Sequence, residues 1–225
     1  MTVDVRQREP LDLHQVDDSS CLTCVTANLL YVMGVTDTPD PRWVDRQVGR
    51  EPGTAAQRTE ARRFLLQQGL CLHLVCAYKP ERFLLEGFDY LRRYYRRTWD
   101  SSWDEYWTPH RLERHRCECL AALELSTVAT RMRAENREPT LADIRSALDR
   151  GRLVWISVAS DWDEVDCHAV LVYAQRGNAF EVYSPELSRG CLQQYRRRRL
   201  ERLWLRSEGM TAVWRSEPAH RQQRR

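Results

Sequence analysis

The sequence predicts a single domain of the α+β class, and three observations support this prediction. Apolar residues recur at helical spacing in the first half, and a glycine follows each such run. A further amphipathic helix is predicted at 140–148. From residue 153 onward, short apolar runs alternate with turn signals, which is typical of an antiparallel sheet. The 225 residues are enough for one sizeable core, which we expect to span 1–215, followed by a disordered tail at 216–225.

The first predicted helix covers about 20–32. Its apolar residues lie at helical spacing and include Leu22, Val25, Leu29, Leu30 and Val32. Ser19 or Ser20 precedes the helix as a cap, and Gly34 ends it. Cys21 therefore falls in the first helical turn, and Cys24 lies one turn deeper.

The middle of the chain contains two short elements and one unusual segment. Residues 55–69 predict a helix that ends at Gly69, and 70–78 predict a strand. The segment 81–132 is dense in Trp, Tyr and Arg, and we expect a mostly helical insertion. Its aromatic residues serve either as core packing or as a lid or wall over a pocket.

The second half predicts a helix followed by three strands. Thr140 and Asp143 have the spacing of a capping box, and the helix runs to Leu148. Apolar strands follow at 153–158, 168–175 and 179–185, with a hairpin turn at 176–178. Pro185 ends the last of them.

Composition and charge narrow the classes of partner. The net charge is +3, and the candidate basic stretch, 193–206, has the apolar pattern of a packed strand or helix with solvated arginines. We therefore expect no nucleic-acid partner. No apolar run approaches the roughly 20 residues that span a bilayer, and the N-terminus lacks the apolar region of a secretory signal. These features predict a cytoplasmic protein without a membrane partner, whose eight cysteines are reduced.

The pair Cys21 and Cys24 has the CxxC spacing of metal and redox sites. Zinc needs two further ligands, and the candidates lie together at His110, His115, Cys117 and Cys119. That segment predicts a helix, on which Cys117 and Cys119 diverge. A thioredoxin-like motif would follow a strand closely, and none precedes Cys21. We expect no metal and no cofactor.

Covalent catalysis is the stronger interpretation of Cys21. A thiol at a helix N-terminus gains from the helix dipole and free N–H groups, so we expect a lowered pKa for Cys21 and a raised one for the deeper Cys24. His168 opens a predicted strand, where a fixed imidazole can act as base. Gln15, six residues before Cys21, has a side-chain amide that can donate to an oxyanion, with the backbone N–H of Cys21 as second donor.

These residues resemble the motifs of papain-like cysteine peptidases, and most closely those of the bacteriocin-processing (double-glycine leader) peptidases and their stand-alone relatives. Gln15, Cys21 and Gly34 have that family's spacing. A helix, a strand, a strand opening with His168 and a third strand ending at Pro185 also follow the family's order. The resemblance covers about 12–35 and 139–187. It implies a papain-like fold, with Cys21 as nucleophile, His168 as base and Gln15 as the oxyanion residue.

Two positions depart from the family's pattern. Leu22 follows the nucleophile where the family has Gly, and Ser184 precedes Pro185 where the family has Asp. A hydroxyl can accept a hydrogen bond from an imidazole N–H, but it does not stabilise an imidazolium as a carboxylate does. The residue that orients His168 is therefore open between Ser184 and a nearby acid, namely Glu186, Asp161, Asp163 or Asp166.

The predicted function is acyl transfer through a thioester on Cys21. The substrate is a peptide, amide or thioester, whose acyl group is either free or borne on a carrier. With water as acceptor the protein is a peptidase or amidohydrolase. With an amine it is a transglutaminase-like transacylase of natural-product assembly. A non-catalytic binding protein on a degenerate peptidase fold is the third alternative. The sequence leaves these three, and the oligomeric state, open.

Overall fold

The computed structural model describes residues 8–96, 101–159, 167–186 and 191–216. Nearly all of the predicted tail at 216–225 lies outside these residues. The helices are α1 (Cys21–Val32), α2 (Pro41–Gln47), α3 (Arg58–Gln67), α4 (Pro80–Glu86), α5 (Phe88–Tyr94), α6 (Ser101–Tyr106), α7 (Pro109–Val128), α8 (Leu141–Asp149) and α9 (Arg197–Leu203). A short 3-10 helix, η1, spans Arg206–Glu208. No helix among the described residues is long and apolar enough to cross a membrane.

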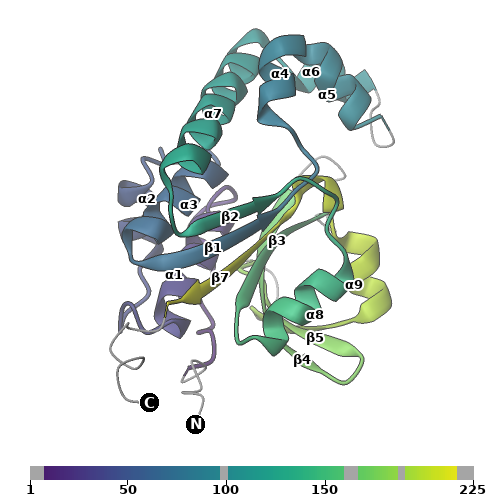
Figure 1. The fold of residues 1–225 in the computed structure, drawn as a ribbon. Coiled ribbons are helices and arrows are strands. Elements are labelled where there is room, and N and C mark those ends of the chain that lie inside the picture. Colours follow the sequence, from purple (N-terminus) through teal and green to yellow (C-terminus); the bar gives the residue numbers. More distant parts are fainter. Residues whose placement is uncertain (1–7, 97–100, 160–166, 187–190, 217–225) are drawn as a thin grey trace.

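Within the described residues, seven strands form one sheet in the order β2-β1-β7-β3-β4-β5-β6. They are β1 (Leu70–Val75), β2 (Met132–Glu135), β3 (Leu153–Ala159), β4 (Cys167–Arg176), β5 (Ala179–Tyr183), β6 (Leu192–Arg196) and β7 (Met210–Arg215). All neighbours are antiparallel except β1 and β2, which are parallel. The last strand, β7, lies between β1 and β3 and so joins the two halves of the chain in one sheet (Figure 1).

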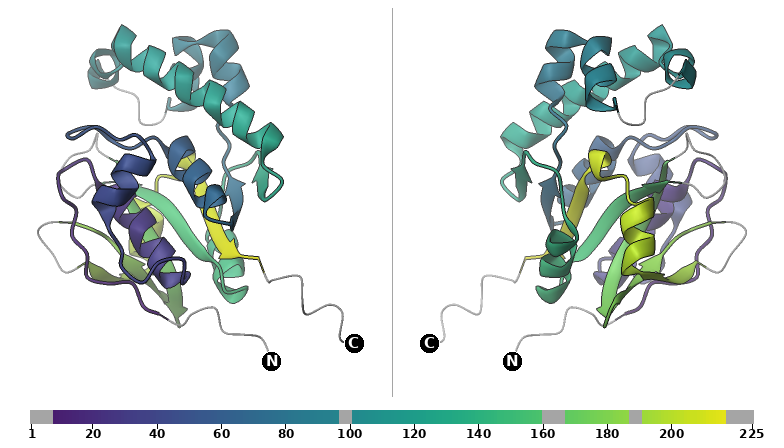
Figure 2. Two further views of the ribbon diagram at one scale, coloured as in Figure 1. Left: turned by 90° about the vertical axis from the view of Figure 1, so that its left-hand side faces the viewer. Right: turned by 90° about the vertical axis from the view of Figure 1, so that its right-hand side faces the viewer.

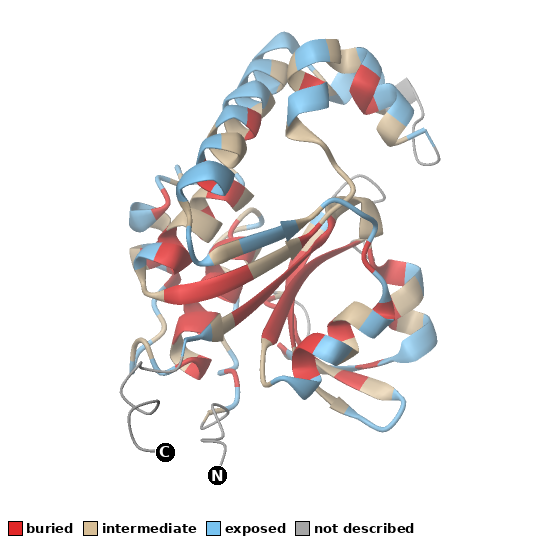
Figure 3. Ribbon diagram, viewed as in Figure 1, coloured by how far each residue is buried: buried red, intermediate tan, exposed pale blue. Residues whose placement is uncertain are grey.

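Helices cover both faces of the sheet (Figures 1 and 2). One core contains α1, α3 and the β3 residues Leu153 and Trp155. The other contains α8, α9 and the alternate β3 residues Val154 and Ile156. Side chains alternate along a strand, so β3 contributes to both cores and is buried along nearly its whole length (Figure 3).

The predicted α+β class is confirmed, and most elements lie where the sequence places them. Thr140 and Asp143 form the capping box: the Asp143 N–H donates to Thr140 Oγ1, and the Thr140 N–H donates to Asp143 Oδ2. Gly34 has a φ of +65° after α1, as a C-terminal glycine does. Two differences stand out. The strands β2 and β7 are present in the structure but are not predicted from the sequence. Ser20 is the N-cap residue of α1, but its side chain does not cap the helix.

Within the segment 81–132, the described residues form most of α4 and all of α5, α6 and α7, which stand beyond the edge of the sheet (Figures 1 and 2). This segment has a small core of its own, made of Phe83, Tyr90, Leu91 and Cys119. Polar contacts tie it to the body of the domain. Tyr95 Oη donates to Glu208 Oε1 over 2.7 Å, and Arg114 Nη2 donates to the Ala55 carbonyl over 2.6 Å.

The backbone at Gly209, just before β7, admits only glycine. Its φ of +78° and ψ of −167° lie in a region closed to side chains, and a Cβ there would lie 2.8 Å from both Cys76 Cβ and the Val75 carbonyl oxygen. We predict that Gly209→Ala lowers the free energy of unfolding by about 3 kcal/mol or more. Gly177→Ala is the matched control: its φ is +59°, but no atom lies within 4 Å of the added Cβ, so the expected loss is about 1 kcal/mol. Equal losses in urea denaturation would contradict this account.

Candidate active site

The first residue of α1 places Cys21 against the sheet. Every residue of α1 except Cys21 and Tyr31 is buried, so the helix is packed on all sides. The Cys21 thiol at its N-terminus accepts a hydrogen bond from the Ala169 N–H of β4, with 3.5 Å between nitrogen and sulfur. Ala169 directly follows His168. The proposed nucleophile therefore lies beside the main chain that bears the proposed base.

Burial controls the acidity of this thiol. It raises the pKa of Cys21 to about 11, against the N–H groups of Ala169 and Leu22 and the charge of Arg58, which lower it. The predicted lowering of the Cys21 pKa is therefore wrong, because desolvation outweighs the helix N-terminus. The prediction for Cys24 is confirmed: burial raises its pKa to about 12. The Cys24 thiol lies 3.7 Å from the His14 carbonyl, to which it donates.

His168 is held by Ser184. The His168 Nε2 lies 3.1 Å from Ser184 Oγ, and Ser184 is fully buried. Ser184 Oγ in turn donates to Glu186 Oε1 over 3.3 Å. Burial lowers the pKa of His168 to about 4, so the ring is neutral at pH 7. An imidazole that uses Nε2 toward Ser184 keeps Nδ1 for another partner.

These contacts bear on the alternatives for the residue that orients His168. Ser184 contacts the ring directly, and Glu186 stands behind Ser184 rather than beside the histidine. The other three candidates, Asp161, Asp163 and Asp166, lie outside the described residues.

Gln15 lies next to the same segment. Its backbone N–H donates to the Pro185 carbonyl over 3.0 Å, so the residue is tied to the chain immediately after Ser184. Its side-chain Oε1 is buried and has no hydrogen-bonding partner among the described residues. This oxygen is an acceptor, whereas the predicted oxyanion role uses the N–H groups of the same amide.

The structure thus brings the predicted residues together in pairs. Cys21 contacts the main chain beside His168, His168 contacts Ser184, and Gln15 is tied to Pro185. Within the described part of the chain, no hydrogen bond joins the Cys21 thiol to the His168 ring or to the Gln15 amide. The catalytic roles of Cys21, His168, Gln15 and Ser184 therefore stay predictions.

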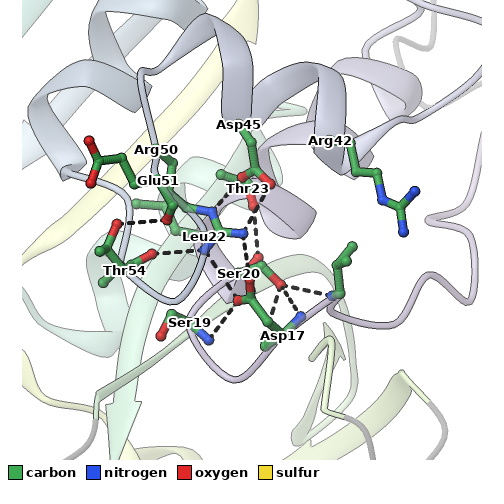
Figure 4. A network of polar contacts seen from close by, with 12 residues as sticks. Asp17, Ser19, Ser20, Leu22, Thr23, Arg42, Asp45, Arg50, Glu51 and Thr54 are labelled. Carbon is green, nitrogen blue, oxygen red and sulfur yellow. Dashed lines mark hydrogen bonds and ion pairs between the residues drawn. The ribbon is translucent and has the colours of Figure 1, made fainter.

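A buried arginine holds the loop between Gln15 and Cys21 (Figure 4). The Arg50 side chain is only 3% exposed and binds both carboxylate oxygens of Asp17 and of Asp45. Its Nη1 also donates to the Thr54 carbonyl. Ser20 Oγ accepts from the N–H groups of Val16 and Asp17 and closes the turn. This network ties the loop before Cys21 to α2 and to the chain after it.

Arg58 is the residue near the site that sequence reasoning missed. Its guanidinium donates to Ser157 Oγ over 3.2 Å and to Cys167 Sγ over 3.3 Å, and it forms an ion pair with Glu208. In the sequence it is one arginine among many, and no local pattern distinguishes it. Cys167 directly precedes His168, and the alternation of side chains along a strand predicts that it points to the opposite face, into the core. That prediction is wrong, because the Cys167 side chain is exposed beside Arg58.

A cavity of about 280 Å³ extends from Arg58 toward the helical segment. From that segment Tyr95, His115 and Cys119 line it. A larger hollow of about 600 Å³ lies over β1, β2 and α8, and none of the predicted site residues lines it. On α7, Cys117 is exposed and Cys119 buried, so the two thiols diverge as expected.

The pH dependence of thiol modification tests the burial of Cys21. With a pKa of about 11, only about one Cys21 thiol in ten thousand is ionised at pH 7. We predict that iodoacetamide modifies Cys21 slowly at pH 7 and about tenfold faster per pH unit up to pH 10. Peptide mapping by mass spectrometry follows the reaction, with the exposed Cys117 as an internal comparison. A rate for Cys21 that levels off below pH 8 would show that the thiolate is stabilised instead.

Arg50→Met tests the network before Cys21. The substitution leaves two carboxylates without their cation, and we predict a loss of about 3 kcal/mol in the free energy of unfolding. Arg46→Met, on the preceding helix α2, is the control, because its pair with Asp40 is exposed and spans 4.0 Å; the expected loss is below about 1 kcal/mol. Thermal and urea unfolding measure both. Similar losses in the free energy of unfolding of the two variants would mean that Arg50 stabilises the fold no more than an exposed arginine does.

Comparisons with known proteins give a likeness of fold alone. No protein-family profile and no curated protein matches the chain. Among solved structures, the chain is similar to a double-glycine motif protease from an AMS/PCAT transporter, crystallised with the leader peptide. That match has a TM-score of 0.46 and 10% identity, and covers 92% of this chain and 90% of the other. It is also similar to the peptidase domain of Streptococcus ComA, a bifunctional ABC transporter involved in quorum sensing. There the TM-score is 0.46 and the identity 10%, with 91% and 97% covered. The roles of individual residues rest on the contacts described above.

Proposed function

We propose that the chain is a cysteine-dependent acyl-transfer enzyme on a papain-like fold, with Cys21 as nucleophile and His168 as base. The observation that supports this most is the pair of contacts at the start of β4. The thiol of Cys21 accepts from the N–H of Ala169, and the adjacent His168 binds Ser184 through Nε2, which leaves Nδ1 as the ring nitrogen that can act as base. A nucleophile, a base and a group that orients the base are the parts that thiol catalysis requires.

In the first step Cys21 Sγ attacks the carbonyl carbon of a peptide, amide or thioester. Because the pKa of Cys21 is raised and that of His168 lowered, thiol and imidazole start as a neutral pair. The proton passes from Sγ to His168 Nδ1 as the S–C bond forms. Hydrogen bonds between catalytic groups are often long in a free enzyme and tighten when the substrate binds, so the ring closes on the thiol at that stage.

The developing oxyanion takes hydrogen bonds from the Gln15 side-chain amide and the backbone N–H of Cys21. Ser184 accepts from the Nε2–H of the imidazolium and donates to Glu186, so the carboxylate charge acts on the ring through the hydroxyl. His168 then returns its proton to the leaving amine, alcohol or thiol. A thioester remains on Cys21, and water or an amine resolves it by adding to the carbonyl and releasing the thiol.

Both acceptors fit this chemistry: with water the enzyme is a peptidase or amidohydrolase, and with an amine it is an amide-forming transacylase. The 280 Å³ cavity adjoins Arg58, but none of Cys21, His168, Gln15 and Ser184 lines it, so it favours neither acceptor. The neutral thiol–imidazole pair in turn fits the third alternative, a binding protein that has lost catalysis.

Trapping the acyl-enzyme tests the proposal. The chain is incubated with p-nitrophenyl acetate, an activated ester, quenched in acid and digested, and the acetylated residue is identified by mass spectrometry. We expect one acetyl group, on Cys21, and none in Cys21→Ala. His168→Ala is expected to slow acylation by about 100-fold or more. Release of the acetyl group is then compared in water and with an added amine, which separates hydrolase from transacylase.

Cys24→Ala is the matched control, because this thiol lies one turn further along the same helix and donates to a carbonyl instead. We expect Cys21 of the Cys24→Ala variant to be acetylated at the same rate as in the unsubstituted chain. Acetylation spread over several cysteines, or unchanged in His168→Ala, would leave the non-catalytic alternative standing.

Ser184→Ala measures the role of the hydroxyl. A hydrogen bond to a charged group contributes about 1.5–3 kcal/mol, so its loss is predicted to lower the acylation rate about 10- to 100-fold. Ser184→Asp places a carboxylate at the same position and is expected to restore or exceed the original rate. If Ser184→Ala acylates at the original rate, Ser184 does not orient His168.

A further inference from the structure

Three potential metal ligands from distant parts of the sequence meet beside the proposed site. Asp12 and His14 belong to the segment before α1, and Cys191 precedes β6. Their ligand atoms all lie within 4.8 Å of one another. The Cys191 Sγ is 3.3 Å from His14 Nδ1, and the Cys191 N–H donates to Asp12 Oδ1 over 2.8 Å.

The separation of the sulfur and nitrogen atoms matches one edge of a small coordination polyhedron. With Zn–S near 2.3 Å and Zn–N near 2.1 Å, a tetrahedral zinc ion holds sulfur and nitrogen ligands about 3.5 Å apart. The observed separation of the Cys191 sulfur and the His14 nitrogen is close to that value. Thiolate, imidazole and carboxylate are also the three side-chain ligands that zinc takes in proteins.

The charge and accessibility of the cluster suit a cation. The Asp12 carboxylate accepts from the Cys191 N–H and forms no ion pair with an arginine or lysine among the described residues. Asp12 and His14 are exposed and the Cys191 thiol is fully buried, so a cation can reach the cluster from solvent and meet the thiol at its base.

We infer that Asp12, His14 and Cys191 form a site for a divalent transition-metal ion, with zinc the best fit. On binding, a sulfur–metal bond forms and the Cys191 proton leaves to solvent. His14 Nδ1 donates to the Glu186 carbonyl over 2.9 Å, and metal binding breaks this hydrogen bond. The Nδ1 lone pair then turns to the metal and the ring proton moves to Nε2, which is open to solvent because His14 is exposed. Three protein ligands leave a further position for water.

The inferred metal site lies where it can hold the segments of Gln15 and Ser184 in position. The Ser184 N–H donates to the Cys191 carbonyl over 2.8 Å, and the Gln15 N–H donates to the Pro185 carbonyl over 3.0 Å. A metal that joins Asp12 and His14 to Cys191 therefore clamps the segment of Gln15 onto that of Ser184. This inference does not depend on the proposed catalysis.

Cobalt(II) titration tests the site, because a cobalt–thiolate bond has an intense ultraviolet charge-transfer band. The full chain is first treated with a chelator and desalted. We expect the band to saturate at one Co²⁺ per chain and to disappear when Zn²⁺ is added in competition. Cys191→Ser is expected to abolish the band, and Cys117→Ser, an exposed thiol elsewhere, to leave it unchanged.

His14→Ala keeps the test valid if Cys191→Ser fails to fold, because His14 is exposed and its loss opens no core cavity. It is expected to weaken Co²⁺ binding at least about tenfold. Cys21→Ala should retain the band, which separates this site from the proposed nucleophile. No saturable band, or a band that survives both Cys191→Ser and His14→Ala, would overturn the inference.

Discussion

The packing of α1 is the constraint on which the rest of the structure depends. α1 is buried on nearly all sides, and the residues that pack around it come from the sheet, α2, α3 and the segment before Cys21. This packing drives the helix N-terminus against β4, so the thiol of Cys21 meets the N–H of Ala169. The same packing removes the thiol from water. The position and the weak acidity of Cys21 therefore have one cause.

Local patterns predicted the parts of the fold that depend on neighbouring residues. The capping box of Thr140 and Asp143, the positive φ of Gly34 and the strand that opens near His168 all follow from short stretches of sequence. β7 was missed, although it is apolar, because its role comes from pairing with β1 and β3, far away in the chain. The lowered pKa expected for Cys21 failed for a similar reason: helix position is local, whereas burial is a property of the whole core.

The candidate site likewise contains some residues that local sequence patterns indicate and others that only the folded chain brings together. Spacing proposed Cys21 and Gln15, and strand order proposed His168, which the structure places in contact with Ser184. Spacing could not rank Ser184 against Glu186, because their relay depends on how the chain turns after β5. Nor could it find Arg58 beside Cys167, or Asp12 and His14 beside Cys191. These pairs are far apart in sequence, and single arginines, acids and histidines carry no local signal.

The charge and tautomer of the His168 ring are the most direct test of the proposed mechanism, because that mechanism starts from a neutral imidazole bound to Ser184 through Nε2. Nitrogen-15 NMR of the imidazole, recorded from pH 3 to pH 9 with His168→Ala to assign the signal, reports both charge and tautomer. The account predicts a pKa of about 4 for His168, with the ring proton on Nε2 above it. A pKa at or above the ordinary value of about 6.5, or a proton on Nδ1 at pH 7, would contradict it.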